Sequence, residues 1–430
     1  MRGWRSWWYL AGCLALLLVP ARALPEAVAA PDGQKSAALQ AAWVQLGPDG
    51  VVLARAITLA DTCPTLDLDG GPRPLRERAA PAPPAFPERV CESEVPAGAT
   101  TAAIAGQLLP VPQGPPRRIV VFGDTGCRVE PPRVQACRDP EQWPFAAVAR
   151  QAAAWQPDLV IHVGDYYYRE EPCPADFAGC RGSPWGDNWD TWTADFFTPA
   201  EPLLRAAPWV LVRGNHELCA RGGQGWFRWL DPFPPAPCSD FTPPYSVPLG
   251  AQRLLVLDSA AANDSEAPPD LVATYGEQLA TLAAAAGPRA WLTTHRPFWG
   301  VAHRGEADGV EQLFRPNATL QAAARQQWPA GVQLVLSGHV HLFELLDYGA
   351  ARPPQLVAGT GGTLLDAAVT TPLAGVEIDG VPIAAGHAAQ RFGFVTLEAA
   401  GDDWELTLRD VAGTPVYACT LRERATACTR

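Results

Sequence analysis

Side chains that can bind metal ions follow five separate apolar segments, each with the length and character of a buried strand. The five groups are Gly123-Asp124-Thr125-Gly126, Gly164-Asp165-Tyr166-Tyr167-Tyr168, Gly214-Asn215-His216-Glu217, Thr293-Thr294-His295 and Gly338-His339-Val340-His341. In layered α/β folds, binding sites lie at the carboxyl ends of the strands. We therefore expect these five segments to converge and to build one site.

The donor atoms of these segments suit a pair of metal ions. They come from seven residues, which are Asp124, Asp165, Tyr168, Asn215, His295, His339 and His341. Seven donors are too many for one tetrahedral zinc ion, but they suit two ions of higher coordination number that share a bridging carboxylate. Oxygen and nitrogen donors without a thiolate favour iron, zinc or manganese. Such a pair clamps the attacking and leaving oxygens of an in-line displacement and generates hydroxide, as hydrolysis of a phosphate ester requires.

Taken one at a time, the same motifs have simpler explanations. A Gly-Asp pair after a strand is often a turn or a helix cap. The tyrosines at 166–168 could be packing residues, and Asn215-His216 could be a polar turn. It is the recurrence after five strands that favours a metal site. His162 lies within an apolar strand segment, so we interpret it as a core histidine.

In this order the motifs resemble those of the calcineurin-like metallophosphoesterase superfamily, and its purple acid phosphatase branch most closely. Gly126 stands where most of the superfamily has a histidine, and Tyr168 stands where that branch supplies a tyrosine. The resemblance covers about residues 117–345. It implies a four-layer αββα sandwich, preceded by a small all-β N-terminal domain that parallels the accessory domain of larger members.

The resemblance also implies a role for each residue. The ligands of Fe(III) would be Asp124, Asp165, Tyr168 and His341. The ligands of the second ion, which would be Zn, Mn or Fe(II), would be Asp165, Asn215, His295 and His339. A metal-bound hydroxide would attack phosphorus, and His216 would stabilise the phosphoryl group or protonate the leaving group. His303 resembles a second pocket histidine, although its spacing from His295 is one residue shorter than expected.

From residue 117 onward, the elements that must position these residues form an α/β pattern. Strands are expected at 119–122, 159–163, 209–212, 254–257, 290–292, 333–336 and 356–358, with helices at 145–155 and 271–285. Three late strands, at 392–397, 404–408 and 416–421, complete a catalytic domain that we place at residues 117–423. Residues 40–112 are interpreted as a small β domain that includes a hairpin over 43–53, and a stiff Pro-rich linker follows.

The composition is that of a packed globular protein, because 48% of the 430 residues are hydrophobic and 18% are charged. The formal net charge of −12 argues against nonspecific binding to nucleic acid or to an anionic membrane. It would also repel a phosphate ester at long range. The site must therefore supply positive charge of its own.

The first 23 residues have the pattern of an export signal. Arg2 and Arg5 precede an apolar stretch that is too short to span a bilayer, and an A-x-A cleavage pattern ends at residue 23. The alternative is an uncleaved membrane anchor. After cleavage we expect no stable membrane span and a secreted or periplasmic protein.

Cysteine usage agrees with export. Eleven cysteines less Cys13 leave ten, an even number. Proximity along the chain suggests five disulfides: Cys63–Cys91, Cys127–Cys137, Cys173–Cys180, Cys219–Cys238 and Cys419–Cys428. The alternative is a thiolate metal site, but no pair has the C-x-x-C spacing that would favour one.

Two further features are open to more than one interpretation. Residues 169–200 form a long insertion with several tryptophans, which could cover the metals, dock an aromatic leaving group, or be a surface loop with buried tryptophans. Asn263-Asp264-Ser265 and Asn317-Ala318-Thr319 are glycosylation sequons, which matter only in a eukaryotic host.

The sequence thus predicts an exported binuclear metal-dependent hydrolase of small-molecule phosphomonoesters. A phosphodiesterase on the same scaffold is the nearest alternative, because the seven ligands do not separate the two substrate classes. A catalytically silent metal- or ligand-binding protein and a metal scavenger are alternatives of another class. The natural substrate, the second metal and the oligomeric state are left open by the sequence.

Overall fold

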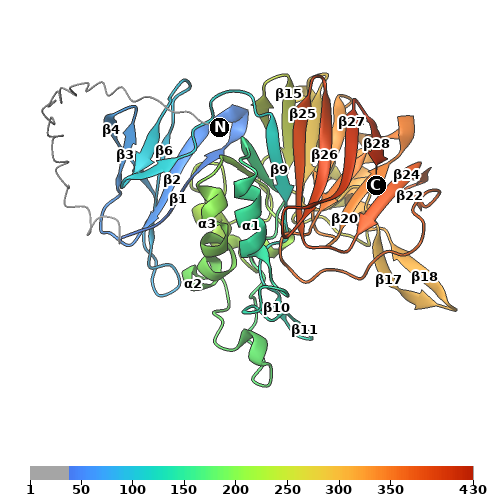
Figure 1. Cartoon of the computed structure of the whole chain (residues 1–430), viewed down its shortest axis with the longest axis horizontal. Helices are drawn as coiled ribbons and strands as arrows, with labels where there is room; N and C mark the ends of the chain where they lie inside the picture. The colour runs from blue at the N-terminus through green and yellow to red at the C-terminus, as the bar shows by residue number, and fades with distance from the viewer. Residues whose placement is uncertain (1–37, 430) are drawn as a thin grey trace, which may run out of the picture.

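The computed structural model describes residues 38–429, so the predicted export signal at residues 1–23 lies outside the described residues. The described chain is a mixed α/β fold built on two large sheets (Figure 1). Among residues 38–429, no helix combines the length and the apolar character that crossing a bilayer requires.

The first large sheet has eleven strands. In sheet order they are β28 (Ala425–Thr429), β27 (Pro415–Arg422), β26 (Asp403–Asp410), β25 (Gly393–Ala400), β9 (Arg118–Phe122), β12 (Leu159–His162), β13 (Trp209–Leu211), β1 (Leu39–Leu46), β2 (Val52–Thr58), β6 (Arg89–Glu94) and β5 (Arg76–Ala79). Strands β9, β12 and β13 are parallel neighbours. Their carboxyl ends therefore lie at one edge of the sheet. All residues of β12 and β13 are buried, as parallel strands covered on both faces require.

The second large sheet has seven strands. In sheet order they are β14 (Tyr245–Leu249), β15 (Gln252–Leu257), β16 (Ala290–Thr294), β19 (Val332–Ser337), β21 (Gln355–Ala358), β20 (Phe343–Asp347) and β24 (Ala385–Ala389). Strands β15, β16, β19 and β21 are parallel. The parallel strands of both sheets fall on the segments that the apolar pattern predicts.

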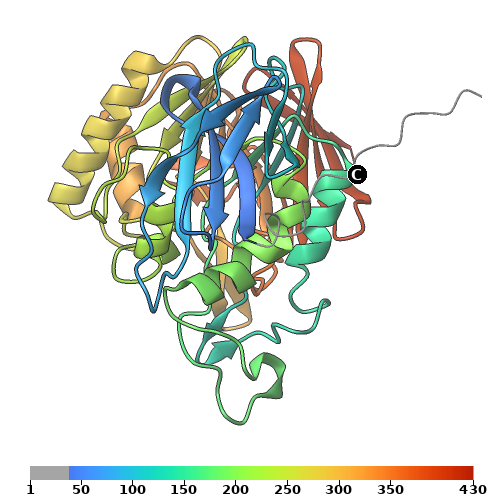
Figure 2. The same ribbon diagram turned by 90° about the vertical axis from the view of Figure 1, so that its left-hand side faces the viewer.

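Helices cover the outer faces of both sheets. The α-helices are α1 (Phe145–Ala154), α2 (Trp189–Trp192), α3 (Thr198–Leu204), α4 (Gly223–Trp229), α5 (Pro269–Ala285) and α6 (Ala318–Gln326). Side chains of α1 and α3 pack on the first sheet, and side chains of α5 and α6 pack on the second. Figure 2 shows α5 (yellow) and α1 (teal) on opposite sides of the strands.

The inner faces of the two sheets pack against each other. Along β9, Val120 faces the helices while Val121 faces the second sheet, because successive side chains of a strand point to opposite faces. Val121 shares its core cluster with Val256 and Leu334 of the second sheet. The mixed α/β fold class is thus confirmed, and these contacts support the expected four-layer αββα sandwich.

Smaller sheets and hairpins lie around this body. They are the four-stranded sheet β4 (Gly71–Pro74), β3 (Thr65–Leu68), β7 (Ala102–Ile104) and β8 (Gln107–Leu109), and the pairs β10 (Val129–Glu130) with β11 (Arg133–Val134), β17 (Ala302–Ala307) with β18 (Val310–Phe314), and β22 (Glu377–Ile378) with β23 (Val381–Pro382). All five predicted disulfides are present.

The N-terminal β segment is continuous with the first large sheet. Strand β1 pairs with β13 in parallel, and β2, β6 and β5 extend the sheet beyond it. Only the small sheet of β4, β3, β7 and β8 stands apart from it. The N-terminal region is therefore rich in strands, as expected, while the division into domains at 40–112 and 117–423 stays a prediction.

A buried charged network attaches these N-terminal strands to the end of α4 and to the segment that follows it. Arg55 and Arg78 both lie within 3.3 Å of Glu92 Oε2. Arg55 donates to the carbonyl oxygen of Asp231, and Arg78 donates to the carbonyl oxygens of Phe227, Arg228, Asp231 and Phe233. Both side chains are at most 1% exposed. The attachment thus depends on charges that are fully withdrawn from water.

We expect Arg78→Ala to lower the free energy of unfolding by about 3–5 kcal/mol, because it leaves a buried carboxylate and four carbonyl oxygens with fewer partners. The matched control is Arg76→Ala, since Arg76 pairs with the other oxygen of Glu92 but its side chain is 62% exposed. That control should cost less than about 1 kcal/mol. Urea unfolding of both variants measures the difference, and equal losses would contradict this account of the network.

Candidate metal centre

The structure brings the five predicted segments together where the parallel strands of both sheets end. Asp124 follows β9, Asp165 and Tyr168 follow β12, and Asn215 follows β13. From the second sheet, His295 follows β16, and His339 and His341 follow β19. Six of the seven are less than 8% exposed, and the seventh, His339, has a side-chain exposure of 18%.

Tyr168 lies at the centre of the first group of donors. Its Oη is 3.1 Å from Asp124 Oδ1, 2.9 Å from Asp165 Oδ2 and 2.9 Å from His341 Nε2. Those four residues are the set that the resemblance assigns to Fe(III). Their donor atoms therefore converge on one small volume.

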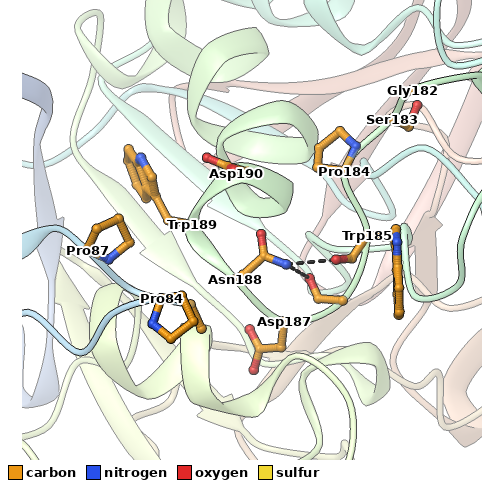
Figure 3. Close-up of a pocket in the computed structure, with 12 residues that line it drawn as sticks. Pro84, Pro87, Gly182, Ser183, Pro184, Trp185, Asp187, Asn188, Trp189 and Asp190 are labelled. Atoms are coloured by element: carbon orange, nitrogen blue, oxygen red, sulfur yellow. Dashed lines mark hydrogen bonds between the residues drawn. The ribbon is translucent and has the colours of Figure 1, made fainter.

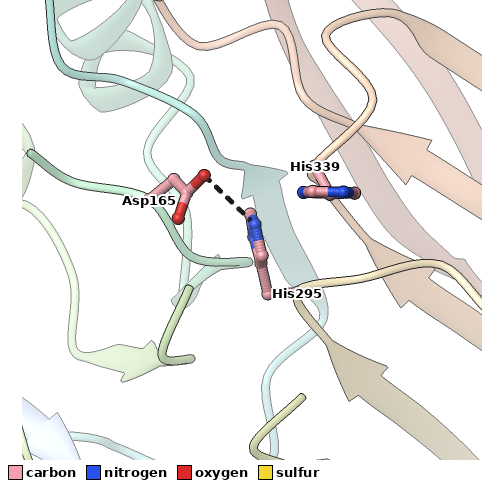
Figure 4. A group of neighbouring side chains, drawn as sticks. All are labelled: Asp165, His295 and His339. Atoms are coloured by element: carbon pink, nitrogen blue, oxygen red, sulfur yellow. Dashed lines mark ion pairs between the residues drawn. The ribbon is translucent and has the colours of Figure 1, made fainter. Parts of the chain in front are cut away.

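Asp165, His295 and His339 form the second group. Each offers one ligand atom, and these atoms lie within 4.8 Å of one another (Figure 4). Asn215 joins this group, since its Oδ1 is 3.1 Å from His295 Nε2. His295 Nε2 is also 3.1 Å from Asp165 Oδ2, so Asp165 belongs to both groups of donors.

Backbone carbonyls fix the orientation of two of these histidines. His295 Nδ1 lies 2.9 Å from the carbonyl oxygen of Val163, and His341 Nδ1 lies 2.8 Å from that of Leu364. Because a carbonyl oxygen can only accept, each Nδ1 carries a proton. This leaves Nε2 of both rings as the nitrogen free to bind a metal ion.

The backbone at the centre is locally unusual. Asp124, Asp165 and His339 have φ values of 58°, 59° and 69°, in the left-handed region that residues other than glycine seldom adopt. Such conformations cluster at functional sites, where the surrounding structure holds them. At Gly214 and Gly338 a Cβ would lie 2.1 and 2.3 Å from an oxygen of Asp165 and Asp124, so only glycine fits.

Glu217 holds two of the strand-end segments together, a role that the sequence analysis missed. Its fully buried carboxylate accepts from the backbone N–H groups of Asp165, Tyr166 and Gly214. Burial and the nearby Asp165 raise the pKa of Glu217 to about 8. Glu217 thus links the segment after β12 to the segment after β13. In the sequence, its position directly after Asn215-His216 was the one feature that could have indicated a role at the site.

His216 is held between several groups at the edge of the centre. Its ring centroid is 3.8 Å from that of Tyr168, and its Nε2 is 3.7 Å from Asp165 Oδ2. Its Nδ1 contacts the Glu170 carboxylate, which also accepts from Arg221. Burial lowers the pKa of His216, although the adjacent carboxylates oppose this effect. The sequence analysis identified neither Glu170 nor Arg221.

Three arginines supply local positive charge around the centre. The guanidinium carbon of Arg128 is 5.2 Å from the centroid of the Tyr168 ring. Arg221 Nη2 is 2.8 Å from His216 Nδ1, and Arg296 Nη1 is 2.9 Å from His339 Nε2. Positively charged side chains are therefore present beside the donor groups, and each of these arginines is paired with a carboxylate.

The donor set fits a pair of metal cations. Within residues 38–429, the ion pairs of Asp124 and Asp165 are all with histidines. Burial by itself lowers the pKa of His295, but Asp165 outweighs it and raises that pKa to about 9. The carboxylates thus place excess negative charge at this position. Buried carboxylates and imidazoles with one nitrogen turned inward are ligands that Fe, Zn and Mn accept.

Within residues 38–429, two other histidines make no hydrogen bond or ion pair with the predicted ligands. His303 is on β17, where its Nδ1 is 2.9 Å from Glu311 Oε1, and no hydrogen bond or ion pair among residues 38–429 joins it to the predicted ligands. Figure 1 shows the hairpin β17–β18 extending from the body of the protein. His162 is fully buried, and its ring stacks on that of Tyr166 with 3.9 Å between the ring centroids, as expected of a core histidine.

Most tryptophans of the 169–200 insertion belong to the core. Trp189 and Trp192 are 8% and 0% exposed and pack against Trp229. Trp185 is 53% exposed and lines a cavity of about 940 Å³ between the insertion and the Pro-rich run that contains Pro84 and Pro87 (Figure 3). The insertion is thus a loop with mostly buried tryptophans, one of the interpretations that the sequence left open.

Disulfides close the segments that lead away from the centre. Cys127 is three residues after Asp124, Cys173 five residues after Tyr168, and Cys219 three residues after His216. Their partners are 10, 7 and 19 residues away along the chain. The three ligand-bearing segments of the first sheet are therefore each followed by a short covalent ring.

Comparisons with known structures find proteins of the same fold. The structure resembles that of purple acid phosphatase PPD1 from yellow lupin (Lupinus luteus) seeds, with a TM-score of 0.56 and 16% identity over 88% of this chain and 73% of that one. It also resembles PhoD, with a TM-score of 0.54 and 12% identity over 92% of each chain. Among curated protein sequences, no match is found.

The model of the calcineurin-like phosphoesterase family matches residues 117–343. That segment includes all five strand-end motifs and more than half of the chain. The two structural likenesses show the same fold, and they extend beyond the matched segment. The chain therefore belongs to the calcineurin-like phosphoesterase family.

Proposed function

We propose that this phosphoesterase is an exported, binuclear, metal-dependent hydrolase of small-molecule phosphomonoesters. The observation that carries the proposal is the position of Tyr168 Oη, within 3.1 Å of Asp124, Asp165 and His341. A phenol oxygen surrounded by two carboxylates and an imidazole is a donor set for Fe(III). It is the feature that the purple acid phosphatase branch adds to the family pattern.

In this proposal Asp124, Asp165, Tyr168 and His341 hold Fe(III), and Asp165, Asn215, His295 and His339 hold Zn, Mn or Fe(II). When bound, the two ions would supply a nucleophile at neutral pH and a clamp for the phosphoryl oxygens. Arg221 and Arg296 would attract the anionic ester to the centre.

His216 would donate a proton to the leaving oxygen or stabilise the transferring phosphoryl group. Its Nδ1 is held by Glu170, so its Nε2 is the nitrogen that faces Asp165. Glu170 and Arg221 fix the ring on one side and the Tyr168 ring contacts it on another. A ring held in this way keeps a single orientation toward the substrate, as general acid catalysis requires.

Export is supported by the five disulfides, because such bonds form and persist in oxidising compartments. A secreted or periplasmic location is therefore part of the proposal. The same bonds leave none of the ten paired cysteines as a thiolate ligand, which agrees with a centre of oxygen and nitrogen donors.

A phosphodiesterase on the same scaffold is the alternative function. The ligands are common to both reactions, and the space around the centre decides between them. We expect an aryl phosphate monoester to be hydrolysed faster than the matching diester, with both rates abolished by a chelator. Initial rates measured side by side decide the question, and a diester preference would replace the proposed substrate class while leaving the metal centre in place.

We expect His216→Ala to lower kcat by about 10²–10⁴-fold, as loss of a general acid does, while the metal content stays that of the wild type. Metal analysis and initial rates on the same preparations provide the measurement. His303→Ala is the comparison, because His303 contacts Glu311 on the hairpin. An equal loss at His303 would place that residue in the catalytic machinery, and parallel loss of metal at His216 would remove its proposed role.

Charge transfer from a phenolate to Fe(III) would colour the iron-loaded protein purple or pink. We expect Tyr168→Phe to remove the visible absorption band. Tyr167→Phe should leave the band unchanged, since Tyr167 is a buried neighbour that stacks on Trp192. Visible spectra of the three iron-loaded proteins make the comparison, and an iron-replete but colourless wild type would show that Tyr168 is not a ligand.

A further inference from the structure

Asp264, the central residue of the sequon at 263–265, lies beside the proposed centre. Its Oδ2 is 3.0 Å from His339 Nε2 and 2.5 Å from Arg296 Nη1. His339 follows β19, and Arg296 directly follows His295 at the end of β16. One carboxylate oxygen therefore contacts both of the segments by which the second sheet contributes ligands to the centre.

The contact sets the orientation of the His339 ring. A carboxylate can only accept, so the 3.0 Å contact between Asp264 Oδ2 and His339 Nε2 calls for a proton on that nitrogen. Arg296, which can only donate, then bonds to Asp264 rather than to the ring. Asp264 Oδ2 can accept from both of them. His339 then carries its proton on Nε2, and Nδ1 is the nitrogen that is free to bind a metal ion. This is the reverse of His295 and His341, whose Nδ1 atoms face backbone carbonyls.

Asp264 stands on a well-supported loop. Its carbonyl oxygen accepts from the N–H groups of Asn317 and Ala318 at the start of α6, at 2.9 and 3.1 Å. Asn263 Oδ1 accepts from the N–H groups of Ser265 and Glu266. The carboxylate is therefore presented to His339 from a fixed position, and the Asn263 side chain is used within the loop.

We propose that Asp264 is a positioning residue for the second metal ion, which it serves by holding His339 with Nδ1 directed at the centre. A carboxylate that accepts from the outer N–H of a ligating histidine fixes the ring and makes its inner nitrogen a better donor, and losing it typically weakens metal binding by about 10–100-fold. This inference rests on the proposed two-metal centre.

The test is a calorimetric titration of the metal-free full-length protein with Zn²⁺, comparing the wild type with Asp264→Asn. The substitution keeps the size of the side chain and leaves the Asn263-x-Ser265 pattern intact. We expect the wild type to bind two Zn²⁺ ions, and the variant to bind one of them about 10–100-fold more weakly with the other unchanged. Asp403→Asn is the matched control, since Asp403 pairs with Arg422 on β26 and β27, and it should not alter either affinity.

The melting temperature of each metal-free protein separates positioning from folding. If Asp264→Asn lowers the melting temperature and leaves both Zn²⁺ affinities unchanged, Asp264 only supports the fold and the inference fails. Equal weakening of both sites would also overturn it, because the contact reaches only one of the two donor groups. A wild type that binds no Zn²⁺ would count instead against the proposed centre itself.

Discussion

The burial of two carboxylates where the two sheets meet is the constraint on which the rest of the site depends. Asp124 and Asp165 are at most 1% exposed, and burying a charge is costly unless hydrogen bonds and opposite charges surround it. This cost is offset by hydrogen bonds from backbone N–H groups and from the hydroxyl of Tyr168, and by ion pairs with three histidines. The arrangement concentrates negative charge in a space lined by donors, and this is what makes it a metal centre rather than a polar core.

Around these carboxylates the supporting contacts follow one pattern. A carboxylate from one segment holds a functional side chain or backbone turn of a neighbouring segment: Glu217 for the turn at Asp165, Glu170 for His216, and Asp264 for His339. Each contact crosses between strand ends, so the loops fix one another. The two sheets thus determine where the functional residues lie. The carboxylates of Glu217, Glu170 and Asp264 determine how the neighbouring turn and histidine rings are oriented.

The sequence predicted the strands of the central sheets because buried parallel strands are short apolar runs, and this signal is local. It also predicted all five disulfides, since each joins cysteines close along the chain. It could not predict that β1 lies beside β13, because that pairing joins distant segments. Glu170 and Asp264 were missed for the same reason, since nothing in their own neighbourhood indicates contacts with His216 and His339. The ligand roles of the seven donors stay a prediction that the geometry supports.

The order of the strands in the first sheet has a consequence for when the sheet can form during synthesis. Within residues 38–429, this sheet contains both the first strand, β1, and the last, β28, while β9, β12 and β13 lie between them in the chain. Strand β13 pairs with β1, which is made before it, but β9 keeps an unpaired edge until β25 has been made. All seven proposed ligands precede β25 in the chain, so the sheet beneath the metal centre acquires this neighbour only after the ligands themselves have been synthesised.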